Sequence, residues 1–288
     1  MQYHLLKIIS KIVCLLPYST RAKLGDWLGE LCWPLVPQRR KTMAVNNVMQ
    51  SFGLDEPAAL SLVKKSATRF GRMFMEVMYF PKLNKGNISK WVTFQGQEYL
   101  DQALAYGRGV ILATAHQGNW ELLGQTLTLS GYPVAGVAQK QTNAAMDRFF
   151  VEYRQLAGMH VTYKTGVREM INLLGQGWII GLLMDQDASD KGVFVDFFGR
   201  RAATPAGSAV FARMKEAPIV PTFITENGDG THTVIIHPPL WVEKTKNRDE
   251  DIFLTTQKLT NIIEKTIREY PQEWFWLHNR WKTPPPTK

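Results

Sequence analysis

The sequence predicts an α/β fold in which a single domain holds a largely parallel central sheet flanked by helices, and three observations support this. Short apolar runs alternate with helical segments from residue 110 onwards. Such alternation is typical of parallel strands joined by helices that cover both faces of a sheet. The chain also has 288 residues with a hydrophobic content of 45%, which is enough to bury one full core.

An amphipathic helical segment precedes this domain. Apolar residues recur at helical spacing over residues 5–16, with Lys7 and Lys11 between them, and Pro17 ends the run. The segment is too short and too charged to cross a bilayer, which needs about 20 mostly apolar residues. A second apolar stretch at 24–36 holds two tryptophans, which favour membrane interfaces. We expect both stretches to associate with a membrane surface, and the alternative is that they pack on the domain.

The predicted division of the chain has three parts. Residues 1–41 are the N-terminal membrane-associating helices, residues 42–283 are the α/β domain, and residues 284–288 are a proline-rich disordered tail.

The elements of the domain follow in order along the chain. The predicted strands are 110–115, 134–138, 161–163, 178–184 and 219–224. The predicted helices are 120–129, 144–157, 167–174, 205–215 (with Thr204 as N-cap and Pro205 at the first position) and 252–269. A further strand at 233–236 is expected to pair with the preceding one through a glycine-rich turn at 227–230.

The charge balance narrows the class of partner. A formal net charge of +9 favours a phosphate-bearing partner, which means nucleic acid or an anionic membrane. The N-terminal basic residues are interleaved with apolar stretches, and the sequence contains no nucleic-acid-binding motif, so we expect an anionic membrane surface and no nucleic acid. Cys14 and Cys32 fit neither a disulfide framework nor a thiolate metal site, which indicates a reducing compartment.

The most informative local feature is the segment 115–121, AHQGNWE, where a strand ends and a helix begins. Ligands bind at that end of a parallel sheet. Gly118 allows a tight turn and Asn119 is a plausible N-cap. Glu121 stands early enough in the helix to reach back to His116, fix its tautomer and leave the other ring nitrogen free to take a proton from an alcohol.

This arrangement has a general base and an orienting carboxylate but no serine or cysteine nucleophile, so it suits direct attack by a substrate hydroxyl on an activated acyl group. The alternative for His116 is a hydrogen-bonded structural residue. Other chemistries have less support, because the sequence contains no GxSxG, HExxH or GxxxxGK[ST] motif.

The segment 116–121 resembles the HxxxxD/E motif of the lysophospholipid acyltransferase superfamily in its glutamate form, and its flanks resemble the lipid A biosynthesis branch, the lauroyl and myristoyl acyltransferases. The resemblance extends over most of the chain, at Asp185-Gln186, 192–199, 203–207, the trio Asn143, Asp147 and Arg154, and 274–282. The FPEGTR block of glycerol-phosphate acyltransferases is absent, which argues against glycerol 3-phosphate or lysophosphatidate as acceptor.

The resemblance implies that His116 is the general base, that Glu121 orients it, and that the acyl donor is a thioester of acyl carrier protein or of coenzyme A. The reaction that it implies needs no metal or other cofactor besides the acyl thioester. The residues expected to contact the substrates are Asn119, Lys140, Arg154, Asp185 and Asp187. The alternative for the basic ones is a solvated helix face, and for the two aspartates a role in organising the loop or, with less support, in holding a metal.

The function expected from these observations is O-acylation of a lipid A precursor on the cytoplasmic face of a bacterial inner membrane, by a monotopic or peripheral enzyme. Two alternatives remain open. One is acylation of another membrane lipid, such as a glycosylated inositol lipid or an aminolipid, and the other is a catalytically silent lipid-binding protein of the same fold.

Overall fold

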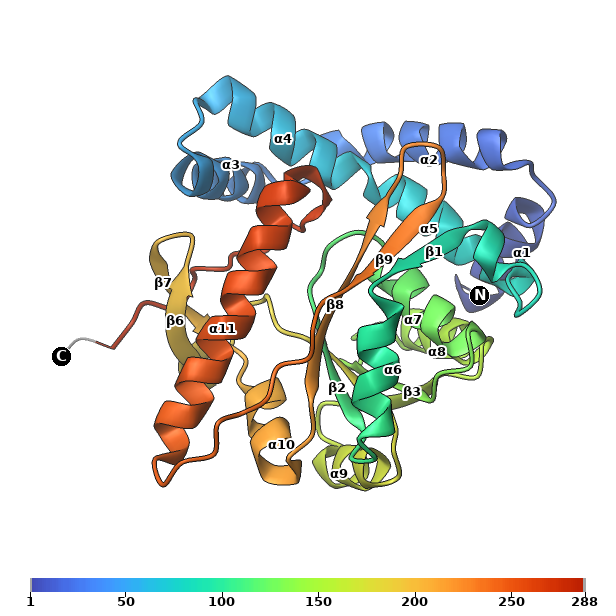
Figure 1. Ribbon diagram of the computed structural model, residues 1–288. Coiled ribbons are helices and arrows are strands. Elements are labelled where there is room, and N and C mark those ends of the chain that lie inside the picture. Colours follow the sequence, from blue (N-terminus) through green and yellow to red (C-terminus); the bar gives the residue numbers. More distant parts are fainter. Residues whose placement is uncertain (1, 287–288) are drawn as a thin grey trace.

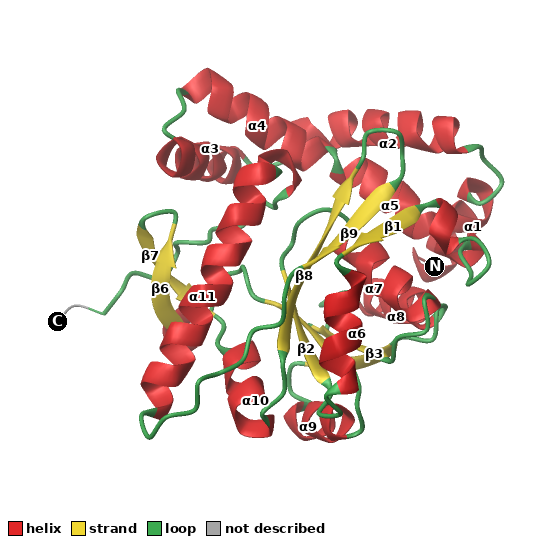
Figure 2. Cartoon of the chain, viewed as in Figure 1, coloured by secondary structure: helices red, strands yellow, loops and turns green. Residues whose placement is uncertain are grey.

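The computed structural model describes residues 2–286 and confirms the α/β fold with its N-terminal helical region (Figure 1). A seven-stranded sheet in the order β1-β9-β8-β2-β5-β3-β4 forms the centre of the molecule, drawn as yellow strands in Figure 2. Its strands are β1 (Val92–Gln95), β2 (Val110–Thr114), β3 (Val134–Ala138), β4 (His160–Tyr163), β5 (Ile179–Leu183), β8 (Ile219–Glu226) and β9 (His232–Ile236).

Most neighbouring strands run parallel, as the alternation of strands and helices predicts. The exception is β9, which pairs antiparallel with β8 and confirms the predicted glycine-rich turn between them. The first strand, β1, is absent from the sequence prediction and lies at the sheet edge, parallel to β9.

Helices cover both faces of the sheet. Helices α9 (Val167–Gly175), α10 (Gly207–Lys215) and α11 (Arg248–Glu269) share one apolar core with one face of the sheet. The other face is covered by α6 (Gln97–Ala105), α7 (Trp120–Leu129) and α8 (Ala144–Gln155), which share a second core. Along β2, Ile111 and Ala113 belong to the first core while Val110 and Leu112 belong to the second, because successive side chains of a strand point to opposite faces.

Five helices precede the sheet: α1 (Gln2–Val13), α2 (Tyr18–Cys32), α3 (Gln38–Phe52), α4 (Glu56–Thr68) and α5 (Phe70–Tyr79). The contacts of α2 with α5 and with the last residue of α4 bring backbone against backbone. A Cβ atom placed on Gly71 would lie 2.0 Å from the carbonyl oxygen of Gly25, and one on Gly29 would lie 1.9 Å from that of Thr68. Only glycine permits helices to approach this closely at these positions.

A two-stranded hairpin, β6 (Val193–Phe197) and β7 (Arg200–Thr204), lies beside α11 and was not predicted. Its presence corrects the expected start of the helix at 205–215. Thr204 ends β7 and is not a helix N-cap, so α10 begins at Gly207. The hairpin turns at Phe198 and Gly199, both with positive φ.

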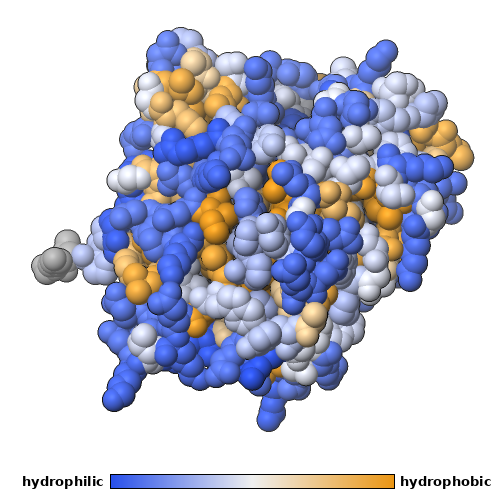
Figure 3. Space-filling model, in the orientation of Figure 1, coloured by the Kyte–Doolittle hydropathy of each residue, from blue (hydrophilic) through white to orange (hydrophobic). Residues whose placement is uncertain are grey.

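The N-terminal helices present apolar side chains to the outside. Ile8 is 56% exposed, Leu15 is 80% exposed and Trp27 is 63% exposed. Figure 3 shows an apolar patch at the upper right, where α1 meets α2 in Figure 1. Within residues 2–286, no helix combines the length and apolar character needed to span a bilayer.

Two parts of the predicted domain division stay predictions. The boundary placed at residue 41 falls inside α3. Of the tail at 284–288, residues 287 and 288 lie outside the described part of the chain.

Candidate active site

The turn between β2 and α7 has the backbone geometry that its sequence predicts. The Asn119 side chain accepts a hydrogen bond from the backbone N–H of Leu122 over 3.0 Å, so it is the N-cap of α7. Gly118 has φ +59°, and a Cβ atom there would lie 1.8 Å from the carbonyl oxygen of Ile224. Glycine is therefore required at 118 for both conformation and space.

The imidazole of His116 is oriented by Asp185. Its Nδ1 lies 2.9 Å from Asp185 Oδ1, and the backbone N–H of His116 donates to Asp185 Oδ2 over 2.9 Å. The same Oδ2 accepts from the Trp274 indole N–H over 2.7 Å. Strands β2 and β5 are parallel neighbours, so the residues that follow them meet at one edge of the sheet.

Asp185 is an ionised partner for His116. Burial raises the pKa of its carboxyl group, but the charge of His116 and the hydrogen bonds from His116 and Trp274 outweigh burial, so the pKa lies below its usual value. An ionised carboxylate only accepts hydrogen bonds, so Nδ1 carries the proton and Nε2 of a neutral His116 ring is free to accept one.

The orienting carboxylate is thus contributed by Asp185, and the expected contact from Glu121 to His116 is not the one that forms. Glu121 is bound by Arg154 of α8, whose Nε and Nη2 donate to its two oxygens over 2.8 Å and 2.6 Å. The reason is geometric. Glu121 lies in the first turn of α7, which packs against α8, so its side chain reaches the neighbouring helix.

His116, Glu121 and Arg154 all line one cavity of about 1270 Å³ at this edge of the sheet. This volume exceeds the range of about 300–1,000 Å³ usual for small-ligand sites, so it suits a long or bulky ligand. Its lining mixes polar residues with many apolar ones, including aromatic and methionine side chains from α5, α7, α8, α9 and α10. The larger apolar lining residues are Phe70, Met73, Phe74, Val77, Trp120, Val137, Phe149, Phe150, Val167, Met170, Leu182, Leu183, Met184 and Phe211.

The remaining predicted substrate-binding residues separate into two groups. Lys140 and Asp187 line the cavity, and Lys140 forms no ion pair with any residue in 2–286. Asp187 also organises its loop, because its carboxylate accepts from the hydroxyl of Thr283 over 2.9 Å and from the backbone N–H of Ser189 over 3.2 Å. Asn119 is outside the lining, since its side chain is 2% exposed and is used within the protein.

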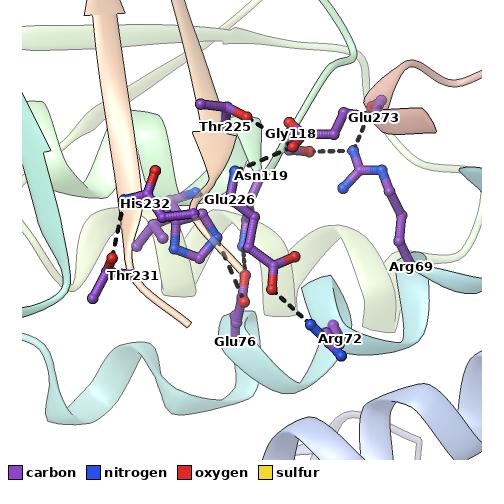
Figure 4. Close-up of polar contacts among 12 residues, drawn as sticks. Arg69, Arg72, Glu76, Gly118, Asn119, Thr225, Glu226, Thr231, His232 and Glu273 are labelled. Atoms are coloured by element: carbon purple, nitrogen blue, oxygen red, sulfur yellow. Dashed lines mark hydrogen bonds and ion pairs between the residues drawn. The ribbon is translucent and has the colours of Figure 1, made fainter. Parts of the chain in front are cut away.

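A polar network holds the turn from its other side, as Figure 4 shows. The Nη2 group of Arg69 donates to the carbonyl oxygens of Gly118 and Glu273, each over 2.6 Å. The Asn119 side-chain amide donates to Glu76 over 2.6 Å, which fixes the side-chain orientation needed for capping. Arg69 and Glu76 come from or adjoin α5, and nothing in the local sequence of 115–121 indicates either partner.

The carboxyl-terminal segment that follows α11 completes the site. The backbone N–H of Phe275 donates to the carbonyl oxygen of His116 over 3.1 Å, and that of Gly118 donates to the carbonyl oxygen of Glu273 over 3.2 Å. His278 lines the cavity and accepts from the backbone N–H of Asp187 over 3.0 Å. The segment 274–282 noted in the sequence thus lies against the turn between β2 and α7.

No group of three His, Cys, Asp or Glu side chains in residues 2–286 is arranged to hold a metal ion. Nε2 of His116 is positioned to accept a proton from a group bound in the cavity, because Asp185 holds Nδ1 and His116 lines the cavity.

Sequence comparison finds relatives among bacterial acyltransferases. A phosphatidylinositol mannoside acyltransferase of Mycolicibacterium smegmatis is 29% identical over 225 residues, covering 76% of this chain and 72% of the relative. The lipid A biosynthesis lauroyltransferase of Escherichia coli K12 is 26% identical over 277 residues, covering 95% and 89%. A lipid A biosynthesis acyltransferase of Haemophilus influenzae is 24% identical, covering 92% and 83%.

The family model for bacterial lipid A biosynthesis acyltransferases matches residues 1–283. An acyl donor and a lipid acceptor are implied by that family. Because this match covers nearly the whole sequence, the chain belongs to the bacterial lipid A biosynthesis acyltransferase family, whose members act in lipid metabolism.

Proposed function

We propose that the protein transfers a fatty acyl group from a thioester to a hydroxyl of a membrane glycolipid, with His116 as general base. The observation that carries this proposal is the buried Asp185 carboxylate bound to Nδ1 of His116, beside a large cavity with many apolar lining residues. Nε2 of His116 takes the proton of the acceptor hydroxyl while the oxygen attacks the thioester carbon. When the C–S bond breaks, the leaving thiolate takes the proton back from His116.

Glu121 has a separate role in this proposal. By binding Arg154 through two hydrogen bonds, it fixes the guanidinium group at the cavity wall. A fixed guanidinium suits a phosphate or carboxylate of a substrate. The exposed Lys140 and Lys164 add positive charge to the lining, which favours the phosphate groups of coenzyme A or of the acyl carrier protein prosthetic group.

A lipid A precursor is the acceptor we infer first, on the support of the family match over 1–283 and of the lauroyltransferase relative that covers 95% of this chain. A phosphatidylinositol mannoside is the second candidate, favoured by the 29% identity to the mannoside acyltransferase. Both candidates are anionic glycolipids with free sugar hydroxyls, and both fit the same catalytic step.

A transfer assay separates these acceptors. The purified protein is incubated with lauroyl or palmitoyl thioesters of coenzyme A and of acyl carrier protein, together with each glycolipid, and products are identified by mass. The expected result is one added acyl chain on one glycolipid class. If the protein binds the lipids yet yields no acylated product from any donor, it is the silent lipid-binding protein of the same fold.

Direct transfer is expected, with no acyl-enzyme intermediate, because no serine or cysteine hydrogen-bonds to His116 among the described residues. Mass analysis of the protein quenched during turnover should show no added acyl group. The cavity lining does contain Ser208, so Ser208→Ala is the decisive control. A rate that collapses in this variant, together with an acylated Ser208 in the wild type, would contradict direct transfer.

We further propose that the enzyme works on the cytoplasmic face of the bacterial inner membrane, with α1 and α2 lying on its anionic surface. Support comes from the exposed Ile8, Ile12 and Leu15 beside basic residues such as Lys11. Deleting α1 is a poor test, because Ser10 and Val13 on its opposite face are buried against the domain. Point substitutions on the exposed face avoid this difficulty.

The variant with Ile8→Ser and Ile12→Ser is expected to bind anionic vesicles about thirtyfold more weakly than the wild type, since every 1.4 kcal/mol is tenfold. Each side chain is about half exposed, so its transfer into lipid contributes about 1 kcal/mol by buried area. Vesicle co-sedimentation measures the binding, and a thermal melt checks that the fold is retained. The matched control carries Leu156→Ser and Leu254→Ser, which remove comparably exposed apolar side chains elsewhere. Equal binding by both variants would favour plain packing of α1 on the domain.

A further inference from the structure

A second histidine, His278, lies in the same cavity as His116, although the two are far apart in the sequence. The segment that carries His278 is bound to the turn between β2 and α7, because the N–H of Phe275 donates to the carbonyl oxygen of His116 over 3.1 Å. The N–H of His278 in turn donates to the carbonyl oxygen of Phe275 over 3.3 Å. The turn 275–278 is therefore bound to the backbone of His116, and both histidines line the same cavity.

The tautomer of His278 is set by the backbone. Its Nε2 lies 3.0 Å from the backbone nitrogen of Asp187, and a backbone N–H can only donate. Nε2 must therefore be unprotonated, and the neutral ring carries its proton on Nδ1. Nδ1 has no hydrogen-bond partner in residues 2–286 and is not among the fully buried unpaired atoms, so this N–H donor is unpaired on a ring that lines the cavity.

The surroundings keep this ring neutral. Burial lowers the pKa of His278, and the charges of His116 and Arg280 lower it further, against the opposing effect of Asp185 and Asp187. The ring is therefore neutral at pH 7, which preserves the single tautomer that donates from Nδ1. A protonated ring would also place two N–H donors, on Nε2 and on Asp187, against each other.

We propose that the Nδ1–H of His278 donates a hydrogen bond to the thioester carbonyl oxygen as that oxygen becomes negatively charged. This rests on the proposed acyl transfer. As the acceptor oxygen bonds to the thioester carbon, its proton moves to Nε2 of His116 and the carbonyl electron pair moves onto oxygen, where His278 stabilises it. The pair then returns, the C–S bond breaks, and His116 returns the proton to the leaving thiolate.

A neutral, fixed donor is suited to this task for a physical reason. A donor already aimed at the developing charge needs no reorganisation during reaction, and it acts strongly where water is excluded. The cations Lys140 and Lys164 that line the cavity are exposed to solvent, so they suit phosphate groups better than the reacting carbonyl. His278 is instead held at two points, by Phe275 and by Asp187.

The competing role is a brace, in which His278 only accepts from Asp187 and holds its loop. The pair His278→Gln and His278→Glu separates the two, because both side chains have the same shape and both offer an oxygen to the Asp187 N–H. Glutamine also retains an N–H donor, whereas an ionised glutamate has none. A brace alone predicts similar rates for the two variants.

The experiment measures kcat and KM for transfer with the donor and acceptor that give the highest wild-type turnover. His278→Glu and His278→Leu are expected to lose about 100-fold to 1,000-fold in kcat, the usual effect of removing one such donor, while His278→Gln stays within about tenfold of wild type. His237→Leu is the matched control, because His237 is a half-buried imidazole outside the cavity lining. Thermal melts of all variants check folding.

Equal kcat values for the Gln and Glu variants, or a loss confined to KM, would overturn the role of His278 at the carbonyl oxygen. Failure of the underlying acyl transfer has a different signature. In that case the wild type itself yields no acylated lipid, or the His116→Ala variant transfers as fast as wild type, whatever the His278 variants do.

Discussion

Replacing His116 by alanine is expected to reduce acyl transfer by about 100-fold to 10,000-fold, because general-base catalysis contributes a factor of that order. The fold should remain intact, since the Asp185 carboxylate keeps its hydrogen bonds from the backbone of residue 116 and from Trp274. The measurement is kcat for product formation by mass detection, beside a thermal melt of the variant.

His160→Ala is the control for that experiment, since His160 pairs with Glu169 at the surface and does not line the cavity. Its turnover should match the wild type. An alanine at 116 that leaves turnover near normal, in protein free of wild-type contamination, would exclude His116 as the base.

The change Asp185→Asn is expected to lower kcat by up to about 10⁴-fold, the effect seen when a histidine base is given the wrong tautomer. The amide of asparagine would donate to Nδ1 of His116, so the ring proton would move to Nε2, the atom that must accept a proton. The asparagine oxygen can still accept from the His116 backbone and from Trp274, which preserves the fold. Steady-state kinetics report the loss.

The matched variant is Glu121→Gln, which distinguishes the two carboxylates. In the structure Glu121 binds Arg154, so this change should leave the tautomer of His116 intact, lower the stability, and raise KM by loosening the guanidinium group that faces the substrates. Hydrogen bonds to charged groups contribute about 1.5–3 kcal/mol, which a thermal or urea melt detects. A larger kcat loss for Glu121→Gln than for Asp185→Asn would restore Glu121 as the residue that orients His116.

These two carboxylates show where sequence reasoning succeeds and where it fails. The positions of His116, Gly118 and Asn119 follow from a strand, a tight turn and a helix start, and each is a local property of consecutive residues. The partner of His116 is not local. Asp185 is 69 residues away, and it becomes a neighbour because β5 inserts between β2 and β3 in the sheet. That strand order leaves no mark in the hydrophobic pattern.

The remainder of the site has the same character. Arg69 and Glu76 precede the strands in the sequence, and Trp274 follows them. Arg69 and Glu76 bind the turn at Gly118 and Asn119, and Trp274 binds Asp185, each across a long separation in the sequence. Arg69 and Glu76 lie in ordinary helical sequence, and Trp274 belongs to the signature 274–282, which does not by itself indicate the partner of the indole. The hairpin that includes Thr204 was missed because a threonine followed by proline also reads as a helix start. The pairing of β7 with β6 makes Thr204 a strand residue and not the start of a helix.

The geometry at Gly118 bears on how related sequences should be interpreted. Any side chain there would collide with the Ile224 backbone, and the adjoining Asn119 is needed to begin α7 whether or not the protein has activity. A homologue that has lost catalysis would still be under pressure to keep both residues, because they maintain the fold. Gly118 and Asn119 are therefore uninformative about chemistry, and under the proposed mechanism a family member should be judged competent or inert by whether the histidine and its distant aspartate survive together.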